Sequence, residues 1–391
     1  MTRRHAPALA GIILLLLLLP DSGTANRRPT LPDRLDDAAF WRLLTECSEP
    51  GGTFRSDNLV SNERAFPAVL PEVARRGSPA SAYIGVGPEQ NFSYLAALKP
   101  RIAFIVDIRR QNAVLHLLYK AIFELSPTRA EFLSRLFSRP RARHLGPNST
   151  PRDLMQAFAI GTPSRDLFEA NTEDIRALLT KTHHWPLGSA DLAGLSHVYE
   201  AFYEQGPEIK YAMRSFRRGV PFPSLAELMT ATDGQGVFRS FLATENAYNV
   251  VRDLQARNLI VPIVGDFSGE RALATVGAFL RSQGLVVTAF YASNVEMYLL
   301  RNDDGGRTFY RNLSALPING QSVLVRSVFR GVGHGGPGGP FGGGGGYPVT
   351  GPGAAGTGLD GRLQADPISG LLAAVQRGEI ASYADLVARV K

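Results

Sequence analysis

The stretch SAYIGVGPEQNFSYLAALKPRIAFIVDIRRQN, residues 81–112, decides the fold. Its first residues, SAYIGVG, have the composition of a strand that ends in a turn at Gly85 and Gly87. The next residues predict a helix with one apolar face, which Pro100 ends. The apolar run RIAFIVD then closes at Asp107, as in a strand that is buried on both faces. A strand, a helix and a second buried strand in this order predict parallel pairing and an α/β fold.

The same alternation returns late in the chain. LIVPIVGDF predicts a strand that ends near Asp266, GERALATVGAFLRSQG predicts a helix, and residues 285–291 predict another strand. GRTFYRNLSAL and QSVLVRSVF are expected to be two last strands that pair at an edge of the sheet. Residues from about 140 to 257 read almost entirely as helices, which predicts a helical insertion. The expected fold is therefore a Rossmann-like, mainly parallel sheet with helices on both faces.

The N-terminus has the plan of a secretory signal. Arg3 and Arg4 precede an apolar run, and small residues follow as far as Ala25. The run is shorter than the roughly 18–20 residues that a membrane span needs. We expect residues 1–25 to be cleaved, which would make the protein periplasmic or extracellular. The alternative is an uncleaved segment that anchors the chain to the inner membrane, and this segment is the only membrane contact that we expect.

Composition divides the rest of the chain. Residues 26–33 form a spacer, and residues 34–330 hold the α/β domain. Residues 331–361 are roughly half glycine, far above the average of about 7%, so they predict a linker. Residues 362–391 turn apolar again and predict a short helical segment. The sequence leaves open whether this segment docks on its own domain or on a partner.

The charge of the chain does not favour a nucleic-acid partner. The formal net charge is +7 over 391 residues, and the arginines are scattered in small clusters. Arg109 and Arg110 follow Asp107, where a salt-bridged surface is favoured over an anion site. The single cysteine, Cys47, excludes an intrachain disulfide, and we interpret it as a buried thiol rather than a nucleophile.

The glycine turn carries the chemistry. Glycines allow the backbone to approach a nucleoside, and an acid at the end of the next strand accepts hydrogen bonds from its ribose. Gly85 and Gly87 supply the first feature and Asp107 supplies the second. Glu89, at the start of the following helix, either contacts a ligand or caps the helix. Ligands of open α/β sheets bind at the carboxyl ends of the strands, so Asp107, Asp266 and the 291–294 turn are expected along one edge.

Other sites are disfavoured by what the motifs lack. Gln90 stands where a dinucleotide site has its third glycine, and no G-K-[ST] follows, which excludes a P-loop. No G-x-S-x-G elbow or H-E-x-x-H motif supports a hydrolase. His183 and His184 are adjacent, a spacing that suits a metal poorly, so we expect no metal.

The short glycine turn followed by an acid resembles the first motif of class I S-adenosylmethionine-dependent methyltransferases. That resemblance implies S-adenosylmethionine as the cofactor, with Gly85, Gly87, Glu89 and Asp107 around it. GDFSG stands where amino-group methyltransferases have Asp/Asn-Pro-Pro-aromatic, and it keeps the acid and the aromatic residue but not the prolines. Asp266 would there orient or deprotonate the methyl acceptor, and capping the next helix is its equal alternative.

Four stretches together resemble an uncharacterised bacterial family with a methyltransferase-like core: YIGVGPEQNFSYLAALKPRIAFIVDIRRQN, RAEFLSRLFSR, LIVPIVGDFSG and VTAFYASNVEMYL. The resemblance covers roughly residues 35–330 and implies a fold more than a reaction. One departure is Tyr83, which stands where methyltransferases usually carry an acid. Two hypotheses follow: an exported methyltransferase with an unknown acceptor, or an exported binding protein that kept the fold without catalysis.

Overall fold

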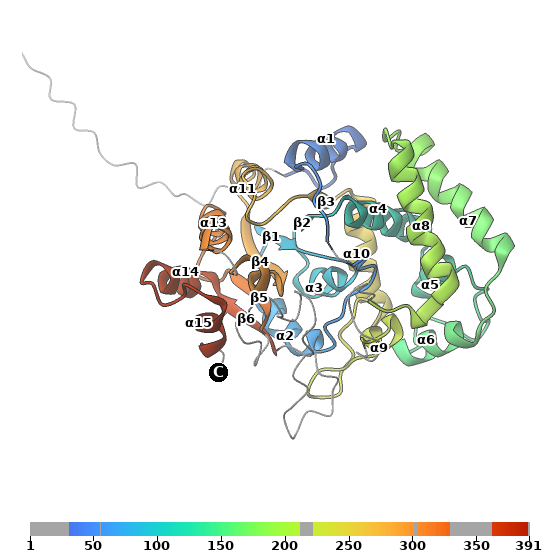
Figure 1. Cartoon of the computed structure of the whole chain (residues 1–391). Coiled ribbons are helices and arrows are strands. Elements are labelled where there is room, and N and C mark those ends of the chain that lie inside the picture. The colour runs from blue at the N-terminus through green and yellow to red at the C-terminus, as the bar shows by residue number, and fades with distance from the viewer. Residues whose placement is uncertain (1–30, 55, 212–221, 301–302, 329–361, 390–391) are drawn as a thin grey trace, which may run out of the picture.

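The computed structural model describes five stretches of the chain, residues 31–54, 56–211, 222–300, 303–328 and 362–389 (Figure 1). The predicted signal, most of the spacer and the glycine-rich residues 331–361 lie outside them. Within the described stretches, no helix combines the length and the apolar character that crossing a membrane requires.

Strands of the described residues form one central sheet: β1 (Ser81–Gly85), β2 (Ile102–Asp107), β3 (Ile260–Val264), β4 (Val286–Ser293), β5 (Val323–Val328) and β6 (Arg362–Pro367). Their order in space is β3-β2-β1-β4-β5-β6. All neighbours pair in parallel except β6, which runs antiparallel to β5. β1, β2, β3 and β5 are buried along their whole length, as parallel strands between two helical layers are.

The helices of the described residues are α1 (Asp37–Cys47), α2 (Leu70–Ala74), α3 (Gln90–Leu98), α4 (Arg110–Glu124), α5 (Arg129–Phe137), α6 (Pro151–Ile160), α7 (Arg165–Ala177), α8 (Ser189–Gln205), α9 (Leu225–Met229), α10 (Glu245–Ala256), α11 (Ala272–Ser282), α12 (Val295–Leu299), α13 (Asp303–Ser314), α14 (Ile368–Gln376) and α15 (Tyr383–Ala388), with single turns η1 (Phe66–Ala68), η2 (Leu178–Thr182) and η3 (Gly206–Glu208). α1, α11, α13 and α14 contact one another in series and form one layer. α2, α3, α10 and α4 form the other layer (Figure 1). The expected α/β architecture is confirmed at this level: a mostly parallel, mixed sheet with helices on both faces.

One predicted strand is wrong. GRTFYRNLSAL lies in α13 and not in a strand. Its aromatic residues suit a strand locally, but β4 and β5 are parallel neighbours, and a parallel pair needs a crossover connection rather than a hairpin. α13 is part of that crossover, and it buries Phe309, Tyr310 and Leu313 on one face.

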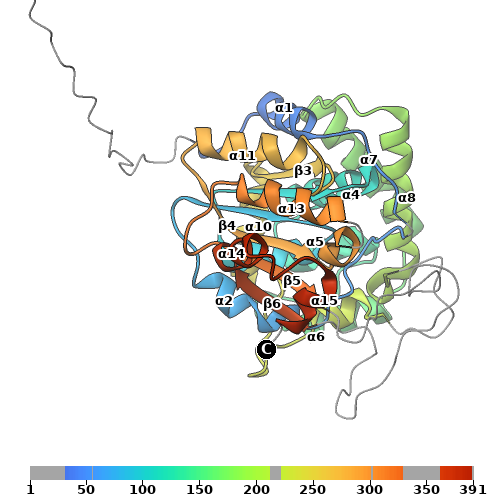
Figure 2. The same ribbon diagram turned by 60° about the vertical axis from the view of Figure 1, so that its left-hand side comes forward.

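The antiparallel partner of β5 comes from beyond the glycine-rich residues. β6 begins the C-terminal segment, for which the sequence predicted only helix, and α14 and α15 follow it (Figure 2). A partly buried ion pair joins the two edge strands, because the buried Arg326 of β5 donates to Asp366 of β6 at 2.7 Å. The same guanidinium lies 3.3 Å from the carboxylate of Glu296 in α12. The segment therefore packs on the sheet of its own chain.

The N-terminal helix is tied to the body of the protein by buried charges. His183 bridges two carboxylates, Asp37 of α1 at 2.8 Å and Glu124 of α4 at 3.0 Å. Lys120, one turn before Glu124, pairs with it at 2.7 Å. The indole of Trp185 stacks on the His183 ring. His183 is thus occupied by side chains that hold α1 in place.

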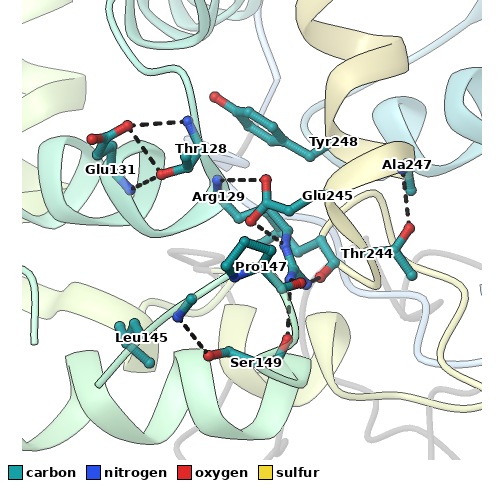
Figure 3. Close-up of polar contacts among 12 residues, drawn as sticks. Thr128, Arg129, Glu131, Leu145, Pro147, Ser149, Thr244, Glu245, Ala247 and Tyr248 are labelled. Carbon is teal, nitrogen blue, oxygen red and sulfur yellow. Dashed lines mark hydrogen bonds and ion pairs between the residues drawn. The ribbon is translucent and has the colours of Figure 1, made fainter. Parts of the chain in front are cut away.

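Helices α5 to α8 gather on one side of the sheet, while α14 and α15 lie on the other (Figure 1). α10 packs on α3 and α4 and so belongs to a layer against the sheet. Arg129 of α5 joins it to this helical region: its Nε donates to Glu245 of α10 at 3.0 Å (Figure 3). Its other two nitrogens donate to the carbonyls of Leu242, Pro147 and Ser149.

Candidate functional site

A cleft opens at the carboxyl ends of β1, β2, β3 and β4. Its volume is about 270 Å³, just below the roughly 300–1,000 Å³ found for small-molecule sites. Aromatic and aliphatic side chains form much of its wall, among them Phe54, Tyr211, Phe267 and Tyr298. The polar side chains that line it are Asn58, Ser61, Asn62, Asp107, Arg109, Asp266, Tyr291, Ser293 and Asn294.

The structure brings most of the predicted site residues to this cleft. Gly87, Asp107 and Asp266 all line it, together with the turn after β4. Gly85 and Glu89 do not line it. The strand ends meet here because the four strands are parallel, so the turn that follows each strand lies at the same edge of the sheet.

Asn91 holds the glycine turn in shape. Its amide nitrogen donates to the carbonyls of Val86, Gly87 and Pro88 at 2.9, 3.1 and 2.7 Å. Its oxygen accepts from the hydroxyl of Tyr83 at 2.8 Å. Asn91 is fully buried, so one side chain satisfies the carbonyls of a turn that no strand or helix pairs. Tyr83, at the position where methyltransferases carry an acid, thereby becomes part of the support of the turn.

The two glycines of the turn have different roles. A Cβ on Gly85 would overlap the Asn91 oxygen and lie 2.6 Å from the Tyr83 hydroxyl, so glycine here makes room for the buried support. Gly87 has φ +77°, a left-handed conformation that glycine adopts without strain, and a Cβ there would meet no atom closer than 3.9 Å. Only Gly87 therefore presents its backbone to the cleft.

His116 supports the turn from α4. Its Nε2 lies 2.9 Å from the carbonyl oxygen of Gly87. Burial lowers the pKa of His116 to about 4, so the imidazole is neutral at pH 7. Since a carbonyl only accepts hydrogen bonds, Nε2 is the nitrogen that carries the proton.

Asp107 is paired inside the protein. Arg109 donates to both of its oxygens, from Nε at 3.0 Å and from Nη2 at 2.9 Å, and the backbone N–H of Arg109 adds a third bond at 2.9 Å. A carboxylate offers about four acceptor positions, so about one remains for a ligand, on Oδ2. The pair is buried, whereas the sequence favoured a salt-bridged surface.

Arg109 also holds the rim of the cleft. Its Nη1 donates to the carbonyls of Ser56 and Asp57, in the loop that contributes Asn58 to the wall. All three nitrogens of the guanidinium thus donate to protein acceptors, and Asp107 balances its charge. Arg110 is separate, because it pairs with Asp191 of α8 at 2.8 Å.

Asp266 lies half-buried after β3. Its Oδ1 accepts from the backbone N–H and the hydroxyl of Ser268, both at 2.8 Å, while Oδ2 has no hydrogen-bond partner among the described residues. It does not cap α11, whose N-cap is Arg271. One oxygen of Asp266 is therefore available at the cleft.

Glu89 and Gln90 turn away from the cleft and tie the loop before α2 to α3. Both oxygens of Glu89 lie within 3.2 Å of the backbone nitrogen of Ser61. Burial raises the pKa of Glu89 to about 7. Gln90 donates to Glu63 at 3.0 Å and to Tyr94 at 3.0 Å. Glu89 and Gln90 therefore support the part of the cleft wall that Ser61 and Asn62 form.

Several residues of the cleft have no signal in the sequence. Phe54, Asn58 and Asn62 lie in a stretch that reads only as a loop, and Glu63 follows them. The remaining chemically active groups lie elsewhere: Cys47 is buried, and burial raises its pKa to about 11. Among the described residues, no group of three His, Cys, Asp or Glu side chains is arranged to hold a metal ion.

Comparison with known proteins adds a family but no activity. A search of curated proteins finds no match to this chain. A family profile matches residues 58–145 and 167–338, which include the glycine turn, the Asp107–Arg109 pair and Asp266 and make up more than half of the chain. The chain belongs to the family described as a domain of unknown function, DUF7790.

Proposed function

We propose that the cleft binds S-adenosylmethionine and that the protein transfers its methyl group to an acceptor. The observation that carries this proposal is the meeting of Gly87, Asp107 and Asp266 in one cleft at the carboxyl ends of the strands. The strand order also supports it, because doubly wound sheets of the order 3-2-1-4-5-6 bind nucleotides beside strand 1, where the strand order reverses. Such a protein would be methyltransferase-like in fold, as the sequence resemblance implies.

The charges of the cleft fit a cationic ligand better than a phosphate. The ionisable side chains that line it, apart from tyrosines, are Asp107, Arg109 and Asp266, which together carry one net negative charge. Arg109 is neutralised by Asp107, so no free cation is left among them for a phosphate group. A sulfonium ligand meets a favourable potential here, and a dinucleotide does not.

The chain supplies binding and positioning. Bound S-adenosylmethionine supplies an electrophilic methyl group on a sulfonium that becomes a thioether. Gly87 offers its backbone to the ligand, and Oδ2 of Asp107 accepts from one ribose hydroxyl. Oδ2 of Asp266 accepts the proton that the acceptor loses when its lone pair takes the methyl group. The acceptor itself stays unassigned.

Titration calorimetry tests the binding step. We expect micromolar affinity for S-adenosylmethionine in the full chain, and an affinity at least about tenfold lower in Asp107→Asn, because the amide loses a charged acceptor for the ribose. NAD should bind far more weakly than S-adenosylmethionine, since its pyrophosphate would meet no free cation among the described side chains that line the cleft.

Asp191→Asn is the matched control, because it breaks a second two-point Arg–Asp pair that does not line the cleft. Its affinity should equal that of the wild type. Folded wild-type protein that binds neither S-adenosylmethionine nor S-adenosylhomocysteine would rule out the proposal.

The pairing of Asp107 favours a second candidate, a binding protein that kept the fold without methyl transfer. Arg109 occupies most of the acceptor positions that an active site would leave for the ribose. In that case an adenosyl ligand would bind the wild type and Asp107→Asn equally, and the function would lie with another occupant of the cleft.

We also propose that the protein is exported through residues 1–25. The motivating observation is the basic, apolar and small-residue order of that segment. Mass spectrometry of protein from the native host should find a mature chain that begins at Asn26. A chain that keeps Met1 and fractionates with the cytosol would contradict export, whereas one that keeps Met1 in the membrane would indicate the anchored alternative.

A further inference from the structure

A buried carboxyl group stands directly behind the β4 wall of the cleft. Glu63 is buried, and four side chains approach its carboxyl group. Tyr291 is 2.7 Å from Oε2 and Ser293 is 2.7 Å from Oε1. Gln90 donates to Oε2 at 3.0 Å, and Ser327 of β5 also hydrogen-bonds to the carboxyl group.

Two of these four neighbours, Tyr291 and Ser293, also line the cleft. A hydroxyl group has one proton to donate and two lone pairs that accept. An ionised Glu63 only accepts, so both hydroxyl protons must point at it and away from the cleft. The oxygens of Tyr291 and Ser293 then offer the cleft lone pairs alone, with a negative charge behind them.

The surroundings make this arrangement sensitive to a charge in the cleft. The titratable groups that face Glu63 are Tyr83 of β1, Tyr94 of α3 and Tyr291 of β4, and burial raises the pKa of each well above its usual value. All three are therefore neutral at pH 7. Burial also raises the pKa of Glu63, and its four hydrogen-bond partners oppose that rise. A cation bound in front of the wall supplies the charge that favours the ionised form.

The backbone of the β4 wall is also linked to Glu63, through Ser293. Ser293 adopts φ +50°, a left-handed conformation that is strained for a non-glycine residue. Its 2.7 Å bond to Glu63 offsets part of that strain. The orientation of the Ser293 hydroxyl is thus tied to Glu63 rather than to a local turn.

We propose that Glu63 makes the β4 side of the cleft a subsite for a positively charged group that donates hydrogen bonds, such as a primary ammonium. The inference rests on the proposed function, because it takes this cleft as the ligand site. It adds the charge of the ligand group that the β4 wall selects. S-adenosylmethionine carries such an ammonium group on its amino-acid end. A carboxylate or phosphate at the same wall would meet lone pairs and a negative charge.

A pair of small probes tests the polarity without any adenosyl group. 2-Phenylethylammonium and 3-phenylpropanoate have similar size and opposite charge, and their binding to the full chain is measured by protein-observed NMR near pH 8. The cation should bind the wild type at least about tenfold more tightly than the anion, which corresponds to about 1.4 kcal/mol. In Glu63→Gln the ratio of the cation's affinity to the anion's should fall to about one or below. The amide N–H donates to a neighbouring hydroxyl oxygen, and the proton of that hydroxyl then points toward the cleft.

Glu173→Gln is the matched control, since it removes the same charge from a surface pair between Glu173 of α7 and Lys181 of η2. It should keep the wild-type preference. Burial raises the pKa of Glu63, so affinity for the cation should rise with pH above the usual titration range of a glutamate in the wild type, because the ionised form binds it better. This rise should vanish in Glu63→Gln. If Glu63→Gln does not fold, Tyr291→Phe replaces it and should lose part of the preference.

Equal binding of the two probes, preference for the anion, binding of neither, or a preference that survives both variants would overturn the inference. These outcomes are separate from the calorimetric test. S-adenosylmethionine binding without charge preference would refute only the subsite, and charge preference without S-adenosylmethionine binding would refute only the proposed cofactor.

Discussion

Replacing Arg129 with methionine should lower the free energy of unfolding by about 3–5 kcal/mol, the cost of removing one partner of a buried ion pair. The Arg129 side chain is only 1% exposed. Figure 3 shows it between α5, α10 and the loop before α6. Methionine fills a similar volume but leaves the carboxylate of Glu245 without its cation. The buried carbonyl of Leu242 loses its donor, which costs about 1–3 kcal/mol before the structure relaxes, and the less buried carbonyls of Pro147 and Ser149 lose theirs at a smaller cost.

Urea unfolding followed by circular dichroism measures this change. Arg129→Lys should fall between wild type and Arg129→Met, because an ammonium keeps the pair with Glu245 but cannot reach three carbonyls at once. The surface control is Arg165→Met, which breaks an exposed pair with Glu169 and should leave the free energy of unfolding nearly unchanged. A loss below about 1 kcal/mol in Arg129→Met would show that the network does not hold the helical region to the sheet.

The second large effect is expected at Gly85. Gly85→Ala should destabilise the protein by about 3 kcal/mol or more, since a methyl group overlaps the Asn91 oxygen and crowds the Tyr83 hydroxyl. Asn91 cannot move aside without releasing the carbonyls of the turn, including that of Gly87. The turn would then lose its shape, and binding of any ligand in the cleft would fall with it.

Gly87→Ala is the matched comparison, two residues along the same turn. It places a methyl group in open space and costs only the strain of a left-handed residue, about 1–2 kcal/mol. Thermal unfolding of the two variants should therefore rank Gly85→Ala as clearly the less stable. Equal melting temperatures, or Gly87→Ala as the weaker protein, would contradict the assignment of Asn91 as the support of the turn.

These two glycines show which features of the site the sequence predicts and which it does not. The G-x-G spacing predicts a turn after a strand, and the structure has it. The sequence assigns both glycines to the approach of a cofactor, but only Gly87 lines the cleft. Gly85 is needed because the side chain of Asn91, six residues later, lies against it. The spacing of the glycines does not show in which direction the Asn91 side chain points.

The cleft was only partly visible in the sequence for a similar reason. Asp107 and Asp266 are recognisable because each stands at the end of an apolar run that becomes a buried strand. Glu63 stands in a loop-like stretch without periodicity, and its partners Tyr291 and Ser293 are more than 220 residues away. No local pattern links them.

Apolar runs and helical periodicity are local properties, so residue patterns alone predict the buried strands β1 to β4 and the helices between them. The sequence also places an acid after β2 and after β3. Only the folded chain shows that residues 306–314 form part of a crossover helix and that β6 closes the sheet. It also shows that Arg109 neutralises Asp107 and that Glu63 lies behind the cleft. These features depend on pairing between distant segments and on the burial of charge, which take effect only when the chain has folded.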